Sequence, residues 1–415
     1  MHVLMVSEFF PPVTQGGGET SALALAKALA KNGQRVSVLT SRAEGLPEKS
    51  VTEGVLVIRT LGTGKTSNSF VGNIKRLGIT ASIKKELPAL IDLLKPDVLH
   101  ALNITSMPGV AVVARAKGIP AIAHINSPLA FDPKGTLLDG NKERVGQYTF
   151  GAFIASFTRS SIAGRLANPW YLRFNPIVWC VFYRRWSQIR DSFPRFNHFF
   201  PISKTMQRWL VMYGVPIEKT TVVPNIVPIA DAKQIKTNKI PRLFFDGGYA
   251  PLKGLPVVID ALAGISQKYE LHVVGEGVNR VAIEAKAKSL NVKAVFHSFV
   301  PEAEHLAFVA KSDIILFPSL VPEGLGRLVL IAMAAGKPVI ASRIGGMTET
   351  VVDGKTGLLV EPGNVAAWRT AIKSLLSDAK KRKKLGMAGR ERFESEYSAA
   401  SIVKKVMSGY HQVFS

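Results

Sequence analysis

Apolar positions along the chain form short continuous runs that alternate with longer amphipathic stretches. The run Met1–Ser7 is nearly continuous, as in a strand of a buried parallel sheet. A glycine-rich segment, PPVTQGGGE, follows, and Ser21–Asn32 then has helical periodicity and ends at Gly33, a common helix terminator. Val36–Thr40 is the next apolar run. This part of the chain therefore predicts a strand, a glycine-rich loop, a helix and a second strand.

The same alternation continues in two blocks. The first block predicts strands at Val55–Arg59, Val98–Ala101 and Ala121–His124, and helices at Ala81–Leu94 and Gly109–Lys117. The second block predicts strands at Arg242–Asp246, Leu271–Val274, Ala294–His297, Ile314–Phe317 and Pro338–Ala341, and helices at Pro256–Ile265, Val281–Leu290, Ala303–Ala310 and Leu328–Ala335. Strands that alternate with helices are typical of doubly wound α/β domains, so the sequence predicts two parallel sheets covered by helices.

The length of the chain agrees with two domains. A chain of 415 residues, 47% of them hydrophobic, is too long for one ordinary core. Apolar periodicity lapses at 227–239, so we expect a first Rossmann-like domain at 1–226, a second at 240–396, and a last helix at 397–415 that packs back on the first domain. Ligands of such sheets bind beyond the carboxyl ends of the strands, so two domains facing each other across a cleft are expected.

The charge of the chain narrows the choice of partners. A formal net charge of +23 predicts an anionic partner, which could be nucleic acid, an anionic membrane or a phosphorylated substrate. Neither a zinc-ligand spacing nor an RNA-binding signature favours nucleic acid. The single cysteine, Cys180, cannot form an internal disulfide. The N-terminal apolar run is too short for a signal peptide, and no apolar stretch is long enough to span a membrane.

Several loops between a strand and the following helix carry candidate binding residues. Gly16 and Gly17 precede a helix, where backbone amides can approach an anion at the positive end of the helix dipole. The alternative is a tight turn that needs positive φ. Lys253 ends the loop DGGYAPLKG, where a lysine can meet a phosphate, although a solvated lysine is the simpler reading.

Two further features are candidates for ligand binding, and only the second remains one. Gly62–Thr66 reads GTGKT, but Arg59 stands where a phosphate-binding P-loop requires its first glycine, so we interpret this segment as an ordinary loop. His124 ends a predicted strand at the edge where ligands bind. It could donate to or orient a substrate hydroxyl, and a purely structural histidine is an equal alternative.

The segment Pro322–Ser342 carries the strongest local signal. Gly324 and Gly326 allow close backbone approach at a helix N-terminus, where the dipole favours negative charge. Glu323 can accept hydrogen bonds from sugar hydroxyls, with helix capping as the alternative. Most of the following helix is interpreted as core.

In this order, these pieces resemble the retaining glycosyltransferases of the GT-B fold, family 4. The matching stretches are PPVTQGGGE (Pro11–Glu19), PISKTMQRWLVMYGV (Pro201–Val215), VVPNIV (Val222–Val227), LKG (Leu252–Gly254), VVGEG (Val273–Gly277) and the long segment Ser312–Asn364. The resemblance covers most of the chain and is strongest from Pro241 to Pro362. It implies an α/β GT-B fold in which two doubly wound domains face each other across a cleft that holds a nucleotide sugar.

The resemblance also assigns roles to residues. Lys253 would contact the donor pyrophosphate, and Glu323 would hold the transferred sugar. The donor would also meet the backbone of Gly16, Gly17, Gly324, Leu325 and Gly326, and His124 would lie near the reacting centre. The nucleotide sugar is a substrate, so neither a cofactor nor a metal is implied. Amides, a lysine and a helix dipole can stabilise the charge that grows on the leaving diphosphate.

Two positions depart from the family pattern. Ile331 stands where the family has a second glutamate that contacts the ribose, and Gly248 stands where it commonly has an arginine aimed at the phosphates. Arg327 is the nearest candidate to bring charge back to the phosphates, with a side chain that simply points to solvent as the alternative. Either other groups replace these contacts, or the donor differs from the usual one, or the site is weak or inactive.

The segment Arg144–Arg195 differs in composition from the rest of the chain. It has eight arginines, one acidic residue and many aromatic residues, a composition typical of membrane interfaces. We therefore expect 144–195 to bind an anionic membrane surface. The alternatives are a helical part of the first domain with its aromatics in the core, and a surface for single-stranded nucleic acid, which the resemblance disfavours.

Together these features predict a retaining hexosyltransferase that moves a sugar from a nucleotide-sugar donor to a hydroxyl of a glycan or lipid-linked acceptor. We expect it to be cytoplasmic and peripheral on the inner face of the cell membrane, with no nucleic-acid partner. One alternative is an inactive relative that binds a glycan or lipid or supports a partner enzyme. Another is an epimerase or phosphorylase of the same fold, although the residues that those activities need are not recognised in the sequence.

Overall fold

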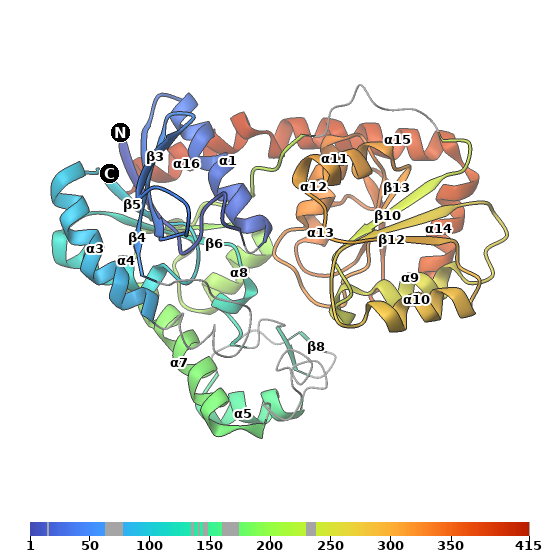
Figure 1. Ribbon diagram of the computed structural model, residues 1–415, viewed down its shortest axis with the longest axis horizontal. Helices are drawn as coiled ribbons and strands as arrows, with labels where there is room; N and C mark the ends of the chain where they lie inside the picture. Colours follow the sequence, from blue (N-terminus) through green and yellow to red (C-terminus); the bar gives the residue numbers. More distant parts are fainter. Residues whose placement is uncertain are drawn as a thin grey trace. The chain divides into compact units, whose positions relative to one another are not determined.

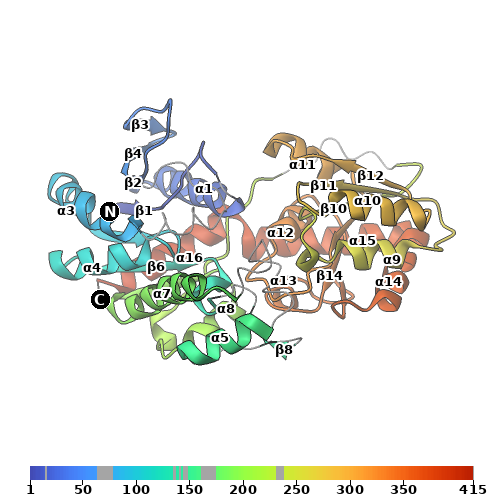
Figure 2. The same ribbon diagram turned by 60° about the horizontal axis from the view of Figure 1, so that its bottom comes forward.

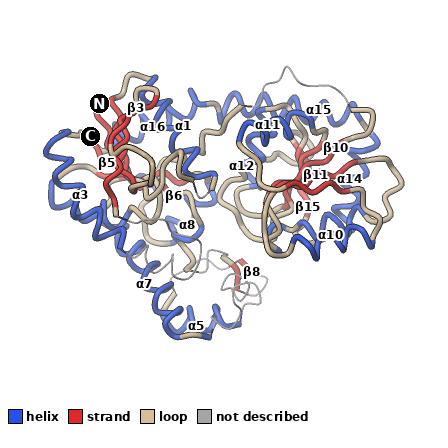
Figure 3. The backbone as a smooth tube through the Cα atoms, viewed as in Figure 1, coloured by secondary structure: helices blue, strands red, loops and turns tan. Residues whose placement is uncertain are grey.

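The chain folds into two compact α/β units. The computed structural model describes residues 1–14, 16–62, 78–133, 137–139, 142–143, 148–159, 174–229 and 238–414. Unit 1 comprises Met1–Ile226 and Ala399–Ser415, and unit 2 comprises Val227–Ser398. In each unit a central layer of strands lies between helices, as Figure 3 shows.

Unit 1 is built on a largely parallel sheet. Within the described residues it has seven strands in the order β3-β4-β2-β1-β5-β6-β9. Their bounds are β1 His2–Val6, β2 Arg35–Ser41, β3 Lys49–Thr52, β4 Val55–Leu61, β5 Val98–Ala101, β6 Ala121–Ile125 and β9 His198–Pro201. Strand β3 alone runs antiparallel to its neighbour, at the edge of a sheet that is otherwise parallel as the sequence predicts. The short ribbon β7 (Leu138–Asp139) and β8 (Lys142–Glu143) lies outside this sheet.

Helices cover both faces of the unit 1 sheet. Helices α1 (Gly17–Lys31) and α16 (Ala399–Gln412) contribute to one buried cluster, in which Leu25 and Tyr410 pack with Val3. The other helices are α3 (Ile79–Leu94), α4 (Met107–Lys117), α5 (Phe150–Arg159), α7 (Pro176–Ser192) and α8 (Lys204–Met212). Figure 2 shows α3, α4 and α7 one beside the next. A β-carbon at Gly109 would lie 2.7 Å from the β-carbon of Ile83, so a glycine allows α4 to approach α3 closely.

Unit 2 is built on a sheet whose neighbouring strands are all parallel. Within the described residues it has six strands in the order β12-β11-β10-β13-β14-β15. Their bounds are β10 Arg242–Asp246, β11 Glu270–Val274, β12 Ala294–His297, β13 Ile314–Phe317, β14 Val339–Ser342 and β15 Gly357–Val360. The order places β10 next to β13, so the loops that follow these two strands leave the same edge of the sheet side by side.

The helices of unit 2 form two layers. Their bounds are α9 Leu255–Leu262, α10 Arg280–Ser289, α11 Glu302–Lys311, α12 Arg327–Ala334, α13 Met347–Thr350, α14 Val365–Ser377 and α15 Ala379–Arg392. Helices α9 and α10 lie on one side of the sheet, and α11, α12 and α15 on the other (Figure 1). Trp368 of α14 is fully buried and packs in one cluster with Ile259 of α9 and Ile283 of α10.

The aromatic residues of 144–195 do not share one environment. Trp186 is 2% exposed and packs edge-on against the buried Tyr148, whereas Phe174 and Ile177 at the start of α7 are 48% and 62% exposed. The expectation of a membrane-facing aromatic set is therefore wrong for Trp186, because this ring completes a core. Arg144, Arg165, Trp170, Tyr171 and Arg173 lie outside the described residues, as does most of GTGKT. In the described part of the chain no helix is long and apolar enough to cross a membrane.

Candidate functional site

The glycine-rich segment of unit 1 opens the N-terminus of α1. Gly16 is the N-cap, and its N–H donates to the Glu19 carboxylate at 3.0 Å. Gly16 has φ −177°, an extended conformation that any residue adopts, so the alternative of a positive-φ turn does not apply to it. A β-carbon at Gly16 would meet nothing within 4 Å. The glycine thus leaves open space in front of Gly17, the first residue of the helix.

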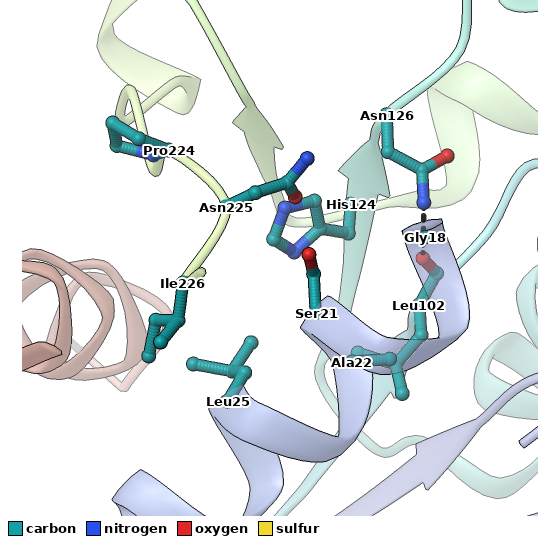
Figure 4. A pocket seen from close by; sticks show the side chains of 10 residues that line it. All are labelled: Gly18, Ser21, Ala22, Leu25, Leu102, His124, Asn126, Pro224, Asn225 and Ile226. Carbon is teal, nitrogen blue, oxygen red and sulfur yellow. Dashed lines mark hydrogen bonds between the residues drawn. The ribbon is translucent and has the colours of Figure 1, made fainter. Parts of the chain in front are cut away.

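His124 lies beside this helix start, near the end of β6. It lines a small pocket with Gly18, Ser21, Asn126 and Asn225, and Figure 4 shows its ring pointing toward α1. The residue is 5% exposed, and within the described part of the chain neither ring nitrogen has a hydrogen-bond partner. A buried polar group without a partner is costly, so both nitrogens are available to a ligand that enters the pocket.

Burial also fixes the protonation state of His124. Loss of hydration lowers the pKa of the ring to about 4, so the imidazole is neutral at neutral pH. A neutral imidazole has one donor and one acceptor nitrogen. Behind it the ring of His100 stacks at a centroid distance of 5.5 Å, and the Nδ1 atom of His100 lies 2.8 Å from the Tyr410 hydroxyl. A buried polar pair thus packs against the His124 ring.

In unit 2 the structure brings Lys253 and Glu323 into contact. Lys253 Nζ donates to Glu323 Oε1 at 2.8 Å, and the two side chains are 39% and 21% exposed. The contact follows from the sheet order, because Lys253 follows β10 and Glu323 follows the adjacent β13. The Leu320 N–H donates to the Leu252 carbonyl at 2.8 Å and ties the two loops together. Gly254, with φ +74°, packs directly against the Pro318 carbonyl, where a side chain would not fit.

The segment after Glu323 presents backbone donors at a helix start. Gly326 is the N-cap of α12, and the Gly346 N–H donates to the Glu323 carbonyl at 2.8 Å. Within the described residues, no hydrogen bond uses the amides of Gly324, Leu325 or Gly326 as donors. The helix dipole adds positive potential at the same point. Together with Lys253 of the neighbouring loop, this loop offers unused donors, a carboxylate and an ammonium, groups that can bind a sugar phosphate.

The two positions that depart from the family pattern are structurally constrained. Gly248 has φ +61°, and a β-carbon there would lie 2.6 Å from the Glu276 carbonyl oxygen, so an arginine cannot be accommodated at this position without a shift of the backbone. Ile331 is 1% exposed in the middle of α12, so this position offers no acceptor to a ligand. Arg327, the candidate to bring charge back to the phosphates, pairs with Glu302 of α11 at 2.6 Å.

Some polar residues around the site were not predicted from the sequence. Ser21, Asn126 and Asn225 line the His124 pocket. The Asn126 amide donates to the Leu102 carbonyl at 3.0 Å, which fixes its orientation. Two signals pointed to them: Asn126 lies two residues beyond His124, and Asn225 lies within the quoted motif VVPNIV. Within each unit, then, the predicted residues cluster, with Gly16, Gly17 and His124 in unit 1 and Lys253 and Glu323 beside 324–326 in unit 2.

Comparison with known proteins identifies the class. The model of "Glycosyltransferase Family 4" matches residues 15–231, and that of "Glycosyl transferases group 1" matches residues 228–392. Two α/β units matched in this way define a GT-B group 1 glycosyltransferase. The chain belongs to Glycosyltransferase Family 4, whose model covers more than half of it.

Curated relatives align over part of their length. An uncharacterized glycosyltransferase of Methanocaldococcus jannaschii is 32% identical over 41% of this chain and 47% of that protein. A GDP-mannose-dependent alpha-(1-6)-phosphatidylinositol monomannoside mannosyltransferase of Mycolicibacterium smegmatis is 37% identical over 34% of this chain and 40% of that protein. The aligned region thus spans less than half the length of either relative.

Solved structures confirm the fold over the whole chain. A sucrose-phosphate synthase from Thermosynechococcus elongatus superposes with a TM-score of 0.76 at 20% identity, covering 100% of this chain and 99% of that one. The Anabaena protein HepE in complex with UDP and glucose superposes with a TM-score of 0.67 at 17% identity, covering 99% of each chain. The GT-B fold class predicted from the sequence is therefore confirmed.

Proposed function

We propose that this protein is a retaining hexosyltransferase that transfers a sugar from a nucleotide-sugar donor to a hydroxyl of a glycan or lipid-linked acceptor. The observation that carries the proposal is the contact of Lys253 with Glu323 beside the unused amides of 324–326. Without ligand the ammonium is paired with the carboxylate. A donor diphosphate would compete for the ammonium, and Glu323 would then be available to accept hydrogen bonds from sugar hydroxyls.

The chemistry of transfer follows from these groups. The bond from the anomeric carbon to the diphosphate oxygen breaks as the bond to the acceptor oxygen forms. The acceptor proton moves to the leaving phosphate on the same face of the sugar, which accounts for retention without a carboxylate nucleophile. Lys253, the helix dipole of α12 and the backbone amides stabilise the charge on the leaving diphosphate. His124, neutral and unpartnered, would hydrogen-bond the sugar or the acceptor.

The names of similar proteins support a nucleotide-sugar donor. HepE was solved with UDP and with UDP-glucose, and the mycobacterial relative is named as dependent on GDP-mannose. The name of that relative also contains phosphatidylinositol monomannoside, a glycolipid, which supports a lipid-linked acceptor here. A peripheral position on the cytoplasmic side of the cell membrane, bound through 144–195, would give access to such an acceptor, with the exposed start of α7 as part of the contact surface.

Calorimetry with a panel of UDP-, GDP- and ADP-sugars tests the proposal. One of them should bind, and the anomeric configuration of the transferred sugar, followed by NMR, should be retained. Lys253→Ala should lower kcat/KM by about 10²–10³-fold, the effect of one charge-stabilising group, whereas Lys268→Ala, an exposed lysine of the same unit, should change it little. Binding without transfer to any acceptor would instead favour an inactive relative, and failure of every donor to bind would refute the proposed donor class.

A further inference from the structure

Helix α15 concentrates positive charge on one exposed surface of unit 2. Its fourteen residues contain seven lysines and arginines and one acidic residue, Glu391. Lys380, Lys383 and Lys384 are exposed on it, and within the described part of the chain none of these three lysines forms an ion pair. Met387 is 54% exposed one turn further on. The surface thus combines unneutralised cations with an exposed apolar side chain.

A cavity of about 730 Å³ runs along this helix. Asp313 and Pro338, which immediately precede β13 and β14, lie in its wall, so it opens at the amino ends of these strands. Lys253 and Glu323 follow the carboxyl ends of strands in the same sheet, so the cavity is a separate place. Its volume lies in the range of small-molecule sites, roughly 300–1,000 Å³. Its apolar lining includes Ala334, Ala335, Pro338 and Met387.

Lys337 lines this cavity from its inner side. The residue is 6% exposed, and no hydrogen bond or ion pair of its ammonium group is found within the described residues. Burial lowers the pKa of Lys337, while the charge of Asp313 raises it. Asp313 itself accepts from the Arg242 N–H and the Asn238 side chain, each at 2.8 Å. An anionic ligand in the cavity would stabilise the charged form of Lys337 further, beside the existing effect of Asp313.

The backbone around Lys337 is firmly held. Gly336 has φ +66°, and its carbonyl packs so closely on Gly386 of α15 that only a glycine fits there. The Arg390 guanidinium donates to the Ala334 carbonyl at the end of α12. These contacts fix α15 against the turn that carries Lys337, so the cavity has preformed walls.

We propose that this cavity binds an amphiphile with an anionic head, of the alkyl phosphate class. The head pairs with Lys337, with Lys380 and Lys383 at the rim, and the alkyl chain contacts the apolar wall of Ala334, Ala335 and Met387. Charge selects the head, because the cations of the cavity exceed the acids that line it. The apolar lining favours a ligand with an alkyl chain, because a free inorganic anion would leave that apolar surface exposed to water.

Calorimetry on the full chain with dodecyl phosphate, used below its micelle concentration, tests this assignment. Saturable binding is expected, and Lys337→Met should weaken it at least 10-fold, because a buried charged hydrogen bond is lost. Met387→Glu places an exposed carboxylate at the mouth and should also weaken binding, without touching the core. Lys268→Met, an exposed lysine outside the cavity, is the matched control and should bind as the native chain does.

The probes separate the possible sources of binding. Inorganic phosphate and dodecyltrimethylammonium should both bind at least 10-fold more weakly than dodecyl phosphate. Equal affinity for inorganic phosphate would overturn the amphiphile assignment, and equal affinity for the cationic amphiphile would overturn the role of the lysines. Flotation with phosphatidylglycerol vesicles without any binding of dodecyl phosphate would show a membrane-docking face and overturn the site. Unchanged binding of dodecyl phosphate to both Lys337→Met and Met387→Glu would also overturn the site.

Discussion

At the scale of single residues, position in the sheet explains why the candidate residues meet. Lys253 and Glu323 are seventy residues apart, yet they lie in the loops that follow two adjacent strands, so their side chains meet at 2.8 Å. The sequence predicted both residues from their loops. It could not predict that Arg327 pairs with Glu302, because that contact depends on how α11 and α12 pack. Nor could it show that the backbone at 248 has positive φ and packs closely on the Glu276 carbonyl.

Replacement of Gly248 tests this account. Gly248→Ala should lower the free energy of unfolding by about 1–3 kcal/mol, because the residue has φ +61° and its β-carbon would meet the Glu276 carbonyl at 2.6 Å. Differential scanning calorimetry of the full chain measures the effect. Gly151→Ala is the control, since Gly151 lies in α5 with nothing within 4 Å of an added β-carbon, and it should keep or slightly raise stability. Equal effects of the two changes would contradict the argument.

At the scale of elements, hydrophobic periodicity predicted the inner strands of both sheets and the edge strand β12, and missed the edge strands β3, β9 and β15. Val98–Ala101, Arg242–Asp246, Ala294–His297 and Ile314–Phe317 have the predicted bounds. Strand β3 escaped prediction because its sequence, KSVT, is short and has no buried residue, so no apolar run marks it. Helix α7 was not predicted for the opposite reason, because it has many apolar residues in different environments. Trp186 packs in a core and Ile177 is exposed to solvent, so the apolar positions do not follow one helical period.

The exposed start of α7 tests the proposed membrane contact. Ile177→Glu should reduce flotation with phosphatidylglycerol vesicles several-fold, because a negative charge replaces an exposed apolar side chain. Recovery of the native chain should fall as salt rises, since exposed charges are screened. Val51→Glu, at a 72% exposed valine of β3, is the matched control and should not change flotation. Equal recovery with neutral and anionic vesicles would count against the proposal.

A pair of histidines on β11 and β12 makes unit 2 sensitive to acid. His272 Nδ1 and His297 Nε2 lie 3.1 Å apart, and this hydrogen bond requires at least one neutral ring. Burial lowers the pKa of both residues, so the unfolded chain binds more protons than the folded one at mildly acidic pH. The stability they contribute is therefore complete above about pH 6.5, the usual pKa of histidine, and is lost as the pH falls below it.

Removal of one histidine tests this pH dependence. In the native chain the free energy of unfolding should fall between pH 6.5 and 5, and each such histidine contributes a slope of up to about 1.4 kcal/mol per pH unit. His297→Gln should make the slope shallower, as measured by denaturant titrations at several pH values. At pH 8 the histidines do not titrate, so the difference in free energy of unfolding between the native chain and the variant there gives the cost of the substitution itself. An unchanged slope would show that the pair does not titrate on unfolding.

At the scale of the whole molecule, the last helix belongs to unit 1. Ile402, Val403, Val406 and Tyr410 of α16 share a buried cluster with β1 and α1. Gly409 packs so closely on Phe200 of β9 that a side chain would not fit. The Tyr410 hydroxyl is the only partner found for the His100 ring within the described residues, and His100 stacks on His124. The end of the chain therefore supports the pocket around His124.

Two buried tyrosines provide a test of this support. Tyr410→Phe should lower the free energy of unfolding of unit 1 by about 1–3 kcal/mol, because the buried Nδ1 atom of His100 loses its hydrogen bond. Tyr249→Phe is the control, since the buried Tyr249 hydroxyl has no partner among the described residues, and its removal should be neutral or stabilising. Scanning calorimetry distinguishes the two. A larger loss for Tyr249→Phe would contradict the assigned role of the hydroxyl.

The place of α16 in unit 1 also has a consequence for synthesis on the ribosome. Unit 2 is one uninterrupted stretch of chain, Val227–Ser398, whereas the core of unit 1 needs residues from both the beginning of the chain and 402–410. As the polypeptide emerges, unit 2 has all its own residues before unit 1 does. Unit 2 can therefore complete its fold before unit 1 does, which is the reverse of the usual N-terminal-first order of domain folding. Until α16 leaves the exit tunnel, the apolar residues of β1 and α1 that pack against α16 remain exposed.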